Sequence, residues 1–273
     1  MMSVLRWFVF AVAAIGLNFP VLVTLSTSFK SARELSGNPG LWVQAPTFEN
    51  YRAVFEVSDR LNIFLYLFNS LAVALMGTVL AVALALPAAY AIARGKIGER
   101  TLLPFIVNLR AVPLIIFAIP LYMMFQWLAL LDTRLGLGLI LTIVNLPLAL
   151  VILVNAIRDL PAELDEAALM DGANRTQILI KVVMPLCRPA IVTSLIFGFI
   201  TAWNEFLFGL MLTTSKAVPV TVGASFFFAA SGGGVQWGVA SAVMVVGALP
   251  PMLLGLVMYR QISGSMTAGA VKG

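Results

Sequence analysis

Three polar side chains lie inside long apolar stretches of this sequence, and their types suit contact with a polar solute. Arg110 is the one charged residue of residues 102–128, and Glu205, which follows Asn204, is the one charged residue of residues 190–212. An arginine at the centre of a bilayer costs about 2.5–3.5 kcal/mol even on permissive scales, so it should face water or the protein interior. We expect these three side chains to line a substrate path. Two alternatives are open. Arg110 only fixes helix packing, by pairing with Glu205 or with backbone oxygens near Pro113, or the Glu205 carboxylate is simply hydrated near the outer interface.

The stretch 158–189 is polar and favours two short helices joined by a turn, in the order RDLPAELDEAALMDGANRTQILIKVVMPLCRP. Pro161 suits the first turn of a helix, and acidic side chains stabilise the positive end of a helix. Such acids follow at once, at Glu163, Asp165 and Glu166. Gly172 can take the left-handed conformation that closes a helix. Asn174, with Gln177 three residues later, predicts the cap of the next helix.

The same stretch is similar to a known loop. It contains in order Glu166-Ala167-Ala168, Asp171-Gly172-Ala173 and Met184-Pro185-Leu186. This run resembles the EAA loop of ATP-binding-cassette carbohydrate importer permeases, in the wording of the maltose-type second permease subunit, an inner-membrane component of binding-protein-dependent transport. In that family the loop is a cytoplasmic coupling helix seated in a cleft of the ATPase subunit. The resemblance implies ATPase contacts at Glu163, Glu166, Ala167, Ala168, Asp171 and Gly172. The alternative, a solvated loop between two spans, does not account for the order and spacing of the whole run.

The C-terminal residues 262–273 are mostly small and include three glycines. They resemble the glycine-rich tail of the maltose-type subunit, which enters the interface of the ATPase dimer. The resemblance implies that Thr267, Gly269 and Lys272 contact the ATPase. A frayed chain end is the alternative, because termini are poorly ordered by default.

The composition indicates an integral membrane protein. Of the 273 residues, 61% are hydrophobic and 11% are charged, whereas soluble domains carry about 25% charged residues. A helix of about 20 apolar residues crosses the hydrocarbon core. Six stretches meet this requirement, so we expect one all-α transmembrane domain over the whole chain. The predicted spans are residues 7–29, 68–93, 102–128, 137–157, 190–212 and 239–259.

A short basic loop predicts the orientation of these spans. Arg94, Lys96 and Arg100 lie within seven residues, and short basic loops are typical of the cytoplasmic side. This orientation places residues 158–189 and both termini in the cytoplasm of a bacterial cell and residues 30–62 outside its inner membrane. The net charge of +5 then reflects orientation, since no basic and aromatic patch indicates nucleic acid.

Enzymatic templates are missing from the sequence. A phosphate-binding loop requires a glycine five residues before a Gly-Lys-Ser/Thr run, but Gly95-Lys96 is followed by Ile97 and lacks the upstream glycine. With 0 histidines, a Ser-His-Asp triad and an HExxH zinc site are excluded. We expect no catalytic residue, metal site or cofactor in this chain. ATP and Mg²⁺ would bind to partner ATPase subunits.

Together these features predict the permease subunit of an ATP-driven importer for a sugar or sugar derivative, which couples closure of the ATPases to alternating access. By resemblance, its partners would be a homologous permease, two ATPase subunits and an external solute-binding protein, within membrane lipid. One alternative is an importer of the same family for a non-sugar solute. Another is an ion-coupled secondary carrier, which inverted repeats and a midplane ion site would indicate. Neither feature is evident in the sequence.

Overall fold

The computed structural model describes residues 2–37, 40–58, 61–228 and 235–269. All the regular elements in these residues are helices, which confirms the predicted all-α class. Contacts divide the chain into two units, residues 1–67 with 220–253 and residues 68–219 with 254–273. Two long helices, α4 (Ile63–Gly95) and α14 (Trp237–Gly269), have residues in both units.

The first unit holds the N-terminal helix and the segment that follows it. Its other helices are α1 (Met2–Ser28), α2 (Ala32–Gly37), α3 (Glu49–Phe55) and α13 (Val220–Phe228). The amide of Asn50 donates to the backbone oxygens of Ser28 and Lys30, at 2.9 and 2.8 Å. Gly238 lies so close to the Asn50 side chain that a Cβ at this position would collide with it. The Asn50 amide therefore holds the chain after α1 and packs against the start of α14.

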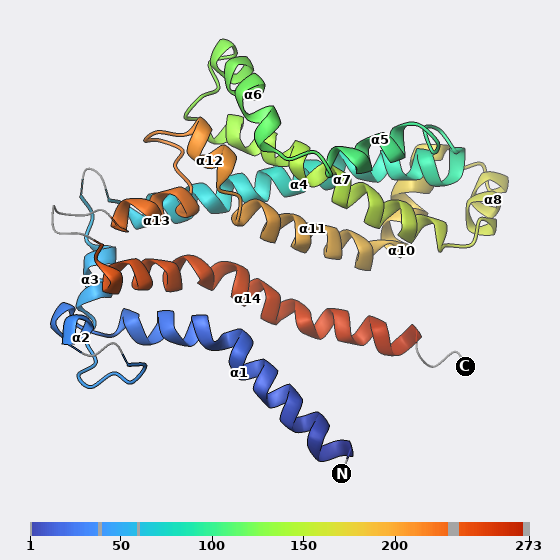
Figure 1. Ribbon diagram of the computed structural model, residues 1–273. Helices are drawn as coiled ribbons and strands as arrows, with labels where there is room; N and C mark the ends of the chain where they lie inside the picture. The colour runs from blue at the N-terminus through green and yellow to red at the C-terminus, as the bar shows by residue number, and fades with distance from the viewer. Residues whose placement is uncertain (1, 38–39, 59–60, 229–234, 270–273) are drawn as a thin grey trace. The chain divides into compact units, whose positions relative to one another are not determined.

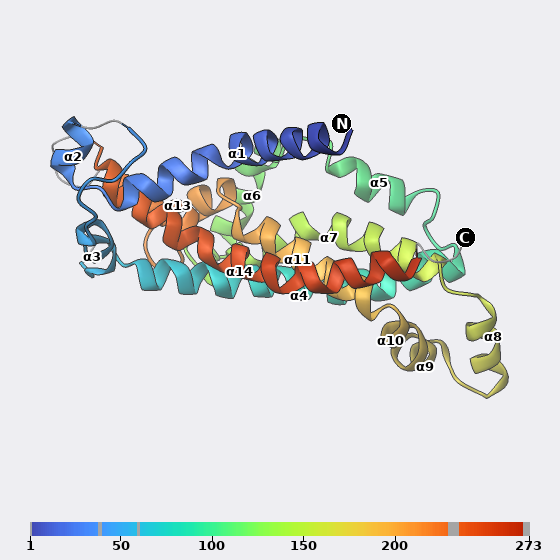
Figure 2. The ribbon, with the colours of Figure 1, turned by 90° about the horizontal axis from the view of Figure 1, so that it is seen from below.

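The second unit holds the remaining helices. They are α5 (Leu102–Leu109), α6 (Ile115–Trp127), α7 (Arg134–Arg158), α8 (Glu163–Met170), α9 (Arg175–Ile178), the π-helix η1 (Leu179–Val183), α10 (Met184–Leu186), α11 (Arg188–Trp203) and α12 (Leu207–Leu212). Helices α4, α7 and α11 run side by side, and α8, α9 and α10 lie together beyond one end of them (Figures 1 and 2). The loop that the sequence singled out thus projects from a three-helix core.

Glycines bring the three core helices of this unit close together. A Cβ at Gly77 of α4 would meet the Leu141 side chain of α7 at 2.6 Å, and one at Gly198 of α11 would meet Thr78 at 2.9 Å. Small residues let membrane helices approach closely, and dispersion contacts and interhelical hydrogen bonds then hold them. One such bond runs from the Asn145 amide of α7 to the Gly198 oxygen at 3.1 Å. The α4–α7–α11 core is therefore closely packed.

Several helices have the length and composition of membrane spans, so the chain is a multi-pass membrane protein. Among the described residues they are Leu5–Ser28, Ile63–Gly95, Arg134–Arg158 and Trp237–Leu256. A fifth is formed if α11 is counted with the residues before it, 175–186, from which it is bent by 77°. The number of six spans stays a prediction.

Two of the predicted spans are interrupted. Residues 102–128 form two helices, α5 and α6, separated by residues 110–114, where we expected one span with proline kinks. Pro113 has no N–H to continue a helical hydrogen-bond ladder, which accounts for a break at this place. Residues 190–212 are likewise divided, because α11 ends at Trp203 and α12 begins at Leu207.

Candidate functional site

Helix α8 is the first element of the loop over residues 158–189, and its ends form as the residue types predict. Its first turn is acidic, with Glu163, Asp165 and Glu166. After its last residue, Gly172 has φ +82°. The N–H groups of Gly172 and Ala173 donate to the oxygens of Leu169 and Ala168, both at 3.0 Å. The left-handed conformation predicted for Gly172 is confirmed. A Cβ at Gly172 would meet nothing within 4 Å, so the demand for glycine is conformational.

The second part of the loop begins with the predicted cap. The Asn174 side chain accepts from the Gln177 N–H at 2.9 Å, and the Gln177 side chain accepts from the Asn174 N–H at 2.9 Å. Each side chain therefore satisfies a backbone donor that the first helical turn leaves without a partner. The π-helix η1 follows α9, and the chain bends by 77° between Leu186 and Arg188.

Apolar residues fasten this second part to the core of the unit. Ile178, Val183 and Cys187 are buried in one cluster with residues of α4 and α7, among them Ile92 and Ile157. This part of the loop is therefore packed against the apolar interior and is not a loop surrounded by solvent.

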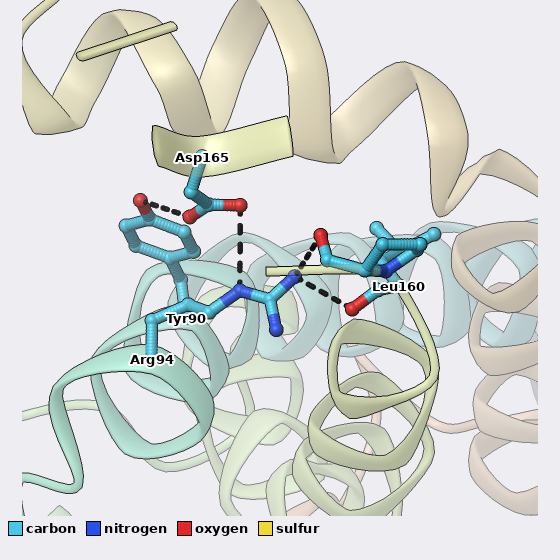
Figure 3. Close-up of polar contacts among 5 residues, drawn as sticks. Tyr90, Arg94, Leu160 and Asp165 are labelled. Carbon is cyan, nitrogen blue, oxygen red and sulfur yellow. Dashed lines mark hydrogen bonds and ion pairs between the residues drawn. The ribbon is translucent and has the colours of Figure 1, made fainter. Parts of the chain in front are cut away.

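Asp165 joins α8 to α4 and was not among the predicted site residues. It is 4% exposed. The Tyr90 hydroxyl donates to Asp165 Oδ2 at 2.8 Å, and Arg94 Nε lies 3.3 Å from Asp165 Oδ1 in an ion pair (Figure 3). The same guanidinium donates to the backbone oxygens of Leu160 at 3.0 Å and Pro161 at 3.4 Å. One arginine at the end of α4 thus holds both the entry to α8 and its first turn.

Helix α8 presents two different faces. Asp165 is buried and Ala168 is half-buried against the core, whereas Ala167 is exposed. Met170 is 88% exposed. The remaining predicted contact residues, Glu163, Glu166, Asp171 and Gly172, are also exposed. The outward face of α8 is therefore open for docking while the inward face holds the helix in place.

The predicted tail residues are only partly described. Thr267 and Gly269 belong to helix α14, and Lys272 lies outside the described residues. The ATPase contacts of this tail stay a prediction.

The three residues of the predicted substrate path do not form one polar cluster. Arg110 is exposed at the end of α5, and no ion pair among the described residues joins it to Glu205. The exposed Asn204 amide donates to the Ile200 oxygen at 2.9 Å, within the same helix. The half-buried Glu205 carboxylate accepts from the backbone N–H of Phe208 at 3.0 Å and of Gly209 at 3.2 Å. Glu205 therefore caps α12, a local role that its position between two apolar segments did not reveal.

A second polar site in the same unit centres on Asp132, in the turn between α6 and α7. Its carboxylate accepts from four successive backbone N–H groups, those of residues 214–217, at 3.0 to 3.1 Å. The Ser215 hydroxyl also donates to it at 2.9 Å. Burial raises the pKa of Asp132, but the backbone donors outweigh burial and hold this pKa below its ordinary value. The carboxylate is therefore a fixed anion that organises the loop before α13.

Two further side chains extend this second site to α4. The Asn69 amide donates to the oxygens of Lys216 and Val218 at 3.0 and 2.9 Å. Arg134 Nε donates to Asn69 Oδ1 at 2.7 Å, and its guanidinium lies 4.9 Å from the centre of the Phe68 ring. These contacts hold together the start of α7, residues 68–69 of α4 and the loop over residues 213–219.

The described residues thus form apolar helices from which a capped, partly anchored helical loop projects. The chain belongs to the family of binding-protein-dependent transport system inner membrane components, whose model matches residues 77–267. The predicted family is therefore confirmed.

Relatives match nearly the whole chain. The sulfoquinovosyl glycerol transport system permease protein SmoH of Agrobacterium fabrum is 35% identical, over 98% of this chain and 94% of its own length. The trehalose/maltose transport system permease protein MalG of Thermococcus litoralis is 34% identical, over 93% of this chain and 91% of its own. The trehalose transport system permease protein SugB of Mycobacterium tuberculosis is 36% identical, over 93% and 92%.

A solved structure has the same fold. It is a chain of a bacterial ABC transporter involved in the import of the acidic polysaccharide alginate. The two chains are 22% identical with a TM-score of 0.78, and the match covers 95% of each. The two chains therefore share one fold.

Proposed function

We propose that this chain is the permease subunit of an ATP-driven, binding-protein-dependent importer of a sugar or sugar derivative. The family membership supports the transport role, and the names of relatives at 34 to 36% identity support the carbohydrate class. The observation that carries the mechanism is the two-faced helix α8, whose outward face is exposed and whose inward face is tied to α4.

In this proposal α8 is the coupling helix. It seats its outward face, with Glu163, Glu166 and Ala167, in a cleft of an ATPase subunit. Binding of ATP and Mg²⁺ to two such subunits draws them together, and this displacement moves α8. Because α9, η1 and α10 continue from the loop into α11, and α7 leads into it, both core helices receive the movement. The core then alternates between inward-open and outward-open states.

The proposal fixes the remaining partners and the orientation. A homologous permease completes the path, and an external binding protein delivers the solute. The basic residues Arg94, Lys96 and Arg100 support a cytoplasmic position for α8, which places both termini in the cytoplasm of a bacterial cell. The C-terminal residues, with Thr267, Gly269 and Lys272, then contact the ATPase dimer.

The substrate path is the least constrained part of the proposal. The exposed Asn204 amide supplies both a donor and an acceptor to a sugar hydroxyl. Glu205 acts through the start of α12, which it caps. Arg110, in the break between α5 and α6, supplies a charge that the chain leaves accessible.

A cross-linking experiment tests the coupling role. Met170→Cys places a thiol at a position of α8 that is 88% exposed, whereas the native Cys187 is buried and out of reach of reagents. In the assembled transporter this thiol should cross-link to the ATPase subunit. Trp127→Cys, at an exposed site on α6, is the matched control and should not. A complex that forms without any cross-link from Met170→Cys would contradict the proposal.

A transport experiment tests the carbohydrate class. The reconstituted transporter, with its binding protein, should take up at least one of the sugars named for its relatives, with trehalose, maltose and sulfoquinovosyl glycerol as probes. Uptake of amino acids but of no sugar would favour the non-sugar alternative. Membership of a binding-protein-dependent family argues against the ion-coupled carrier.

A further inference from the structure

The contact of Asp165 with α4 adds a buried charged group to a loop that apolar packing already holds in place. Apolar residues already pack the loop against the core, at Ile178, Val183 and the half-buried Ala168. Burial of a charged pair costs desolvation, so such a pair is weak evidence of stabilisation by itself. The contact needs another explanation than stability.

The geometry of the contact is directional. A carboxylate on α8 meets a hydroxyl and a guanidinium that stand one helical turn apart on α4, at Tyr90 and Arg94. The Tyr90 hydroxyl gives the carboxylate a charge-assisted hydrogen bond, which defines orientation as well as distance. The Arg94 guanidinium adds an ion pair on the other carboxylate oxygen. Arg94 also holds the Leu160 oxygen, so the chain that enters α8 moves with the same guanidinium.

A nearby ion pair supplies the contrast. Arg158 at the end of α7 contacts Glu99 at 2.7 Å, but each side chain is 38% exposed. Exposed pairs contribute little to stability, because water competes for both partners. The Asp165 side chain is 6% exposed and that of Arg94 is 12% exposed, so water does not readily take the place of either partner.

We propose that Asp165 is a positioning residue that fastens the coupling helix α8 to α4 through Tyr90 and Arg94, so that α8 and α4 move as one body. This inference rests on the proposed function and deepens it, since it names α4 as a helix that receives the displacement of α8. Without the contact, the loop would absorb part of that displacement.

A distance measurement in the assembled transporter tests the fastening. Spin labels are placed at Met170→Cys on α8 and at Leu84→Cys, an exposed position on α4. The distance between them is measured without nucleotide and with ATP and vanadate. In the otherwise unchanged transporter we expect the same distance in both states. In Asp165→Asn and in Tyr90→Phe we expect a distance that shifts or broadens when nucleotide is added.

Two further measurements make the outcome specific. Glu99→Gln makes the same carboxylate-to-amide change in the exposed pair and should leave the distance unchanged. ATP hydrolysis by Asp165→Asn should persist, because the outward face of α8 is intact, whereas general misfolding would abolish it. If Asp165→Asn does not assemble, Tyr90→Phe, which loses only a hydroxyl, decides.

Each result decides between the alternatives. A distance that changes with nucleotide in the parental transporter, or that stays fixed in assembled Asp165→Asn and Tyr90→Phe, overturns the fastening. The mobility of the Met170 label decides the proposed function separately. If that label is as mobile in the complex as in the permease alone, α8 does not dock on the ATPase, and the proposed function and this inference fail together.

Discussion

Two aspartates at different places in one unit show two ways of holding a carboxylate. Asp132 accepts from the backbone N–H groups of residues 214–217, whereas Asp165 is held by the side chains of Tyr90 and Arg94. A backbone cradle depends on the shape of one loop, so it makes that loop rigid. A side-chain contact between helices depends on both helices, so it links their movements. We therefore assign a structural role to Asp132 and a linking role to Asp165.

The largest expected effect comes from leaving Asp165 buried without its cation. Arg94→Met keeps the length and apolar stem of the side chain but removes the charge. Breaking one side of a buried pair costs about 3–5 kcal/mol, so we expect a clear loss in the thermal unfolding temperature of the purified complex. The double variant Arg94→Met with Asp165→Leu removes both charges and should recover most of the loss. Equal instability of the single and double variants would contradict a buried pair.

A smaller effect is expected at the backbone cradle. Asp132→Asn keeps one acceptor oxygen but loses the charge that four N–H groups stabilise, and water can reach the half-buried site. We expect a loss of about 1–3 kcal/mol in the free energy of unfolding, with ATPase coupling intact in the complexes that remain folded. If Asp132→Asn lost ATPase coupling without losing stability, the two aspartates would not have different roles.

The pH dependence of stability sharpens the same contrast. The pKa of Asp132 is lower in the folded chain than its ordinary value, so its ionised form stabilises the fold. This contribution is complete above the ordinary pKa of about 3.9 and is lost as the pH falls through the lowered folded pKa. The parental complex should therefore lose more stability than Asp132→Asn between about pH 5 and pH 2. Parallel curves for the two proteins would count against a cradled anion.

A third change moves the end of α8 without touching Asp165. Gly172 has φ +82°, so Gly172→Val should cost about 1–3 kcal/mol of backbone strain and turn the outward face of α8. We expect assembled transporter with reduced uptake of the probe sugar and reduced cross-linking from Met170→Cys. Gly37→Val, in a short helix of the other unit with open space around it, is the control. If Gly172→Val took up the probe sugar at the parental rate, transport would not depend on the left-handed backbone at this position.

The smallest expected effect on stability is at Asn204. Within the described part of the chain, its amide bonds to the Ile200 oxygen one turn earlier and to no other group, so Asn204→Ala should change the free energy of unfolding by less than about 0.5 kcal/mol. Uptake of the probe sugar should nevertheless fall while basal ATP hydrolysis is retained. Uptake at the parental rate would place the solute contacts elsewhere.

Local chemistry explains which features the sequence predicted correctly. The positive φ of Gly172 and the paired cap of Asn174 and Gln177 are set by neighbouring residues, so their types were sufficient. The helical class followed from composition, because only paired backbone groups are stable in lipid.

Contacts between distant residues were not predicted. Tyr90 and Asp165 are 75 positions apart. In the sequence, Arg94 indicates only orientation and Asp165 is only an acid at a helix start. A usable signal was present, since Asp165 lies three residues before Ala168 and hence on its face of α8. The cap formed by Glu205 was not predicted for a different reason. The cap is local, but it forms because the helix breaks between Trp203 and Leu207. The apolar residues on both sides of this break gave no sign of it.

The π-helix η1 accommodates one residue more than an α-helix would between the same two buried side chains. Ile178 and Val183 are both fully buried, although residues five apart on an α-helix point about 140° away from each other. The wider turn of a π-helix brings them onto one side. One extra residue is thus accommodated as a bulge, and an α-helix one residue shorter would present the same two anchors four apart. Deletion of the exposed Ile180 would then preserve the phase of the helix on both sides, so chains that differ by one residue at this point can still bury the same pair.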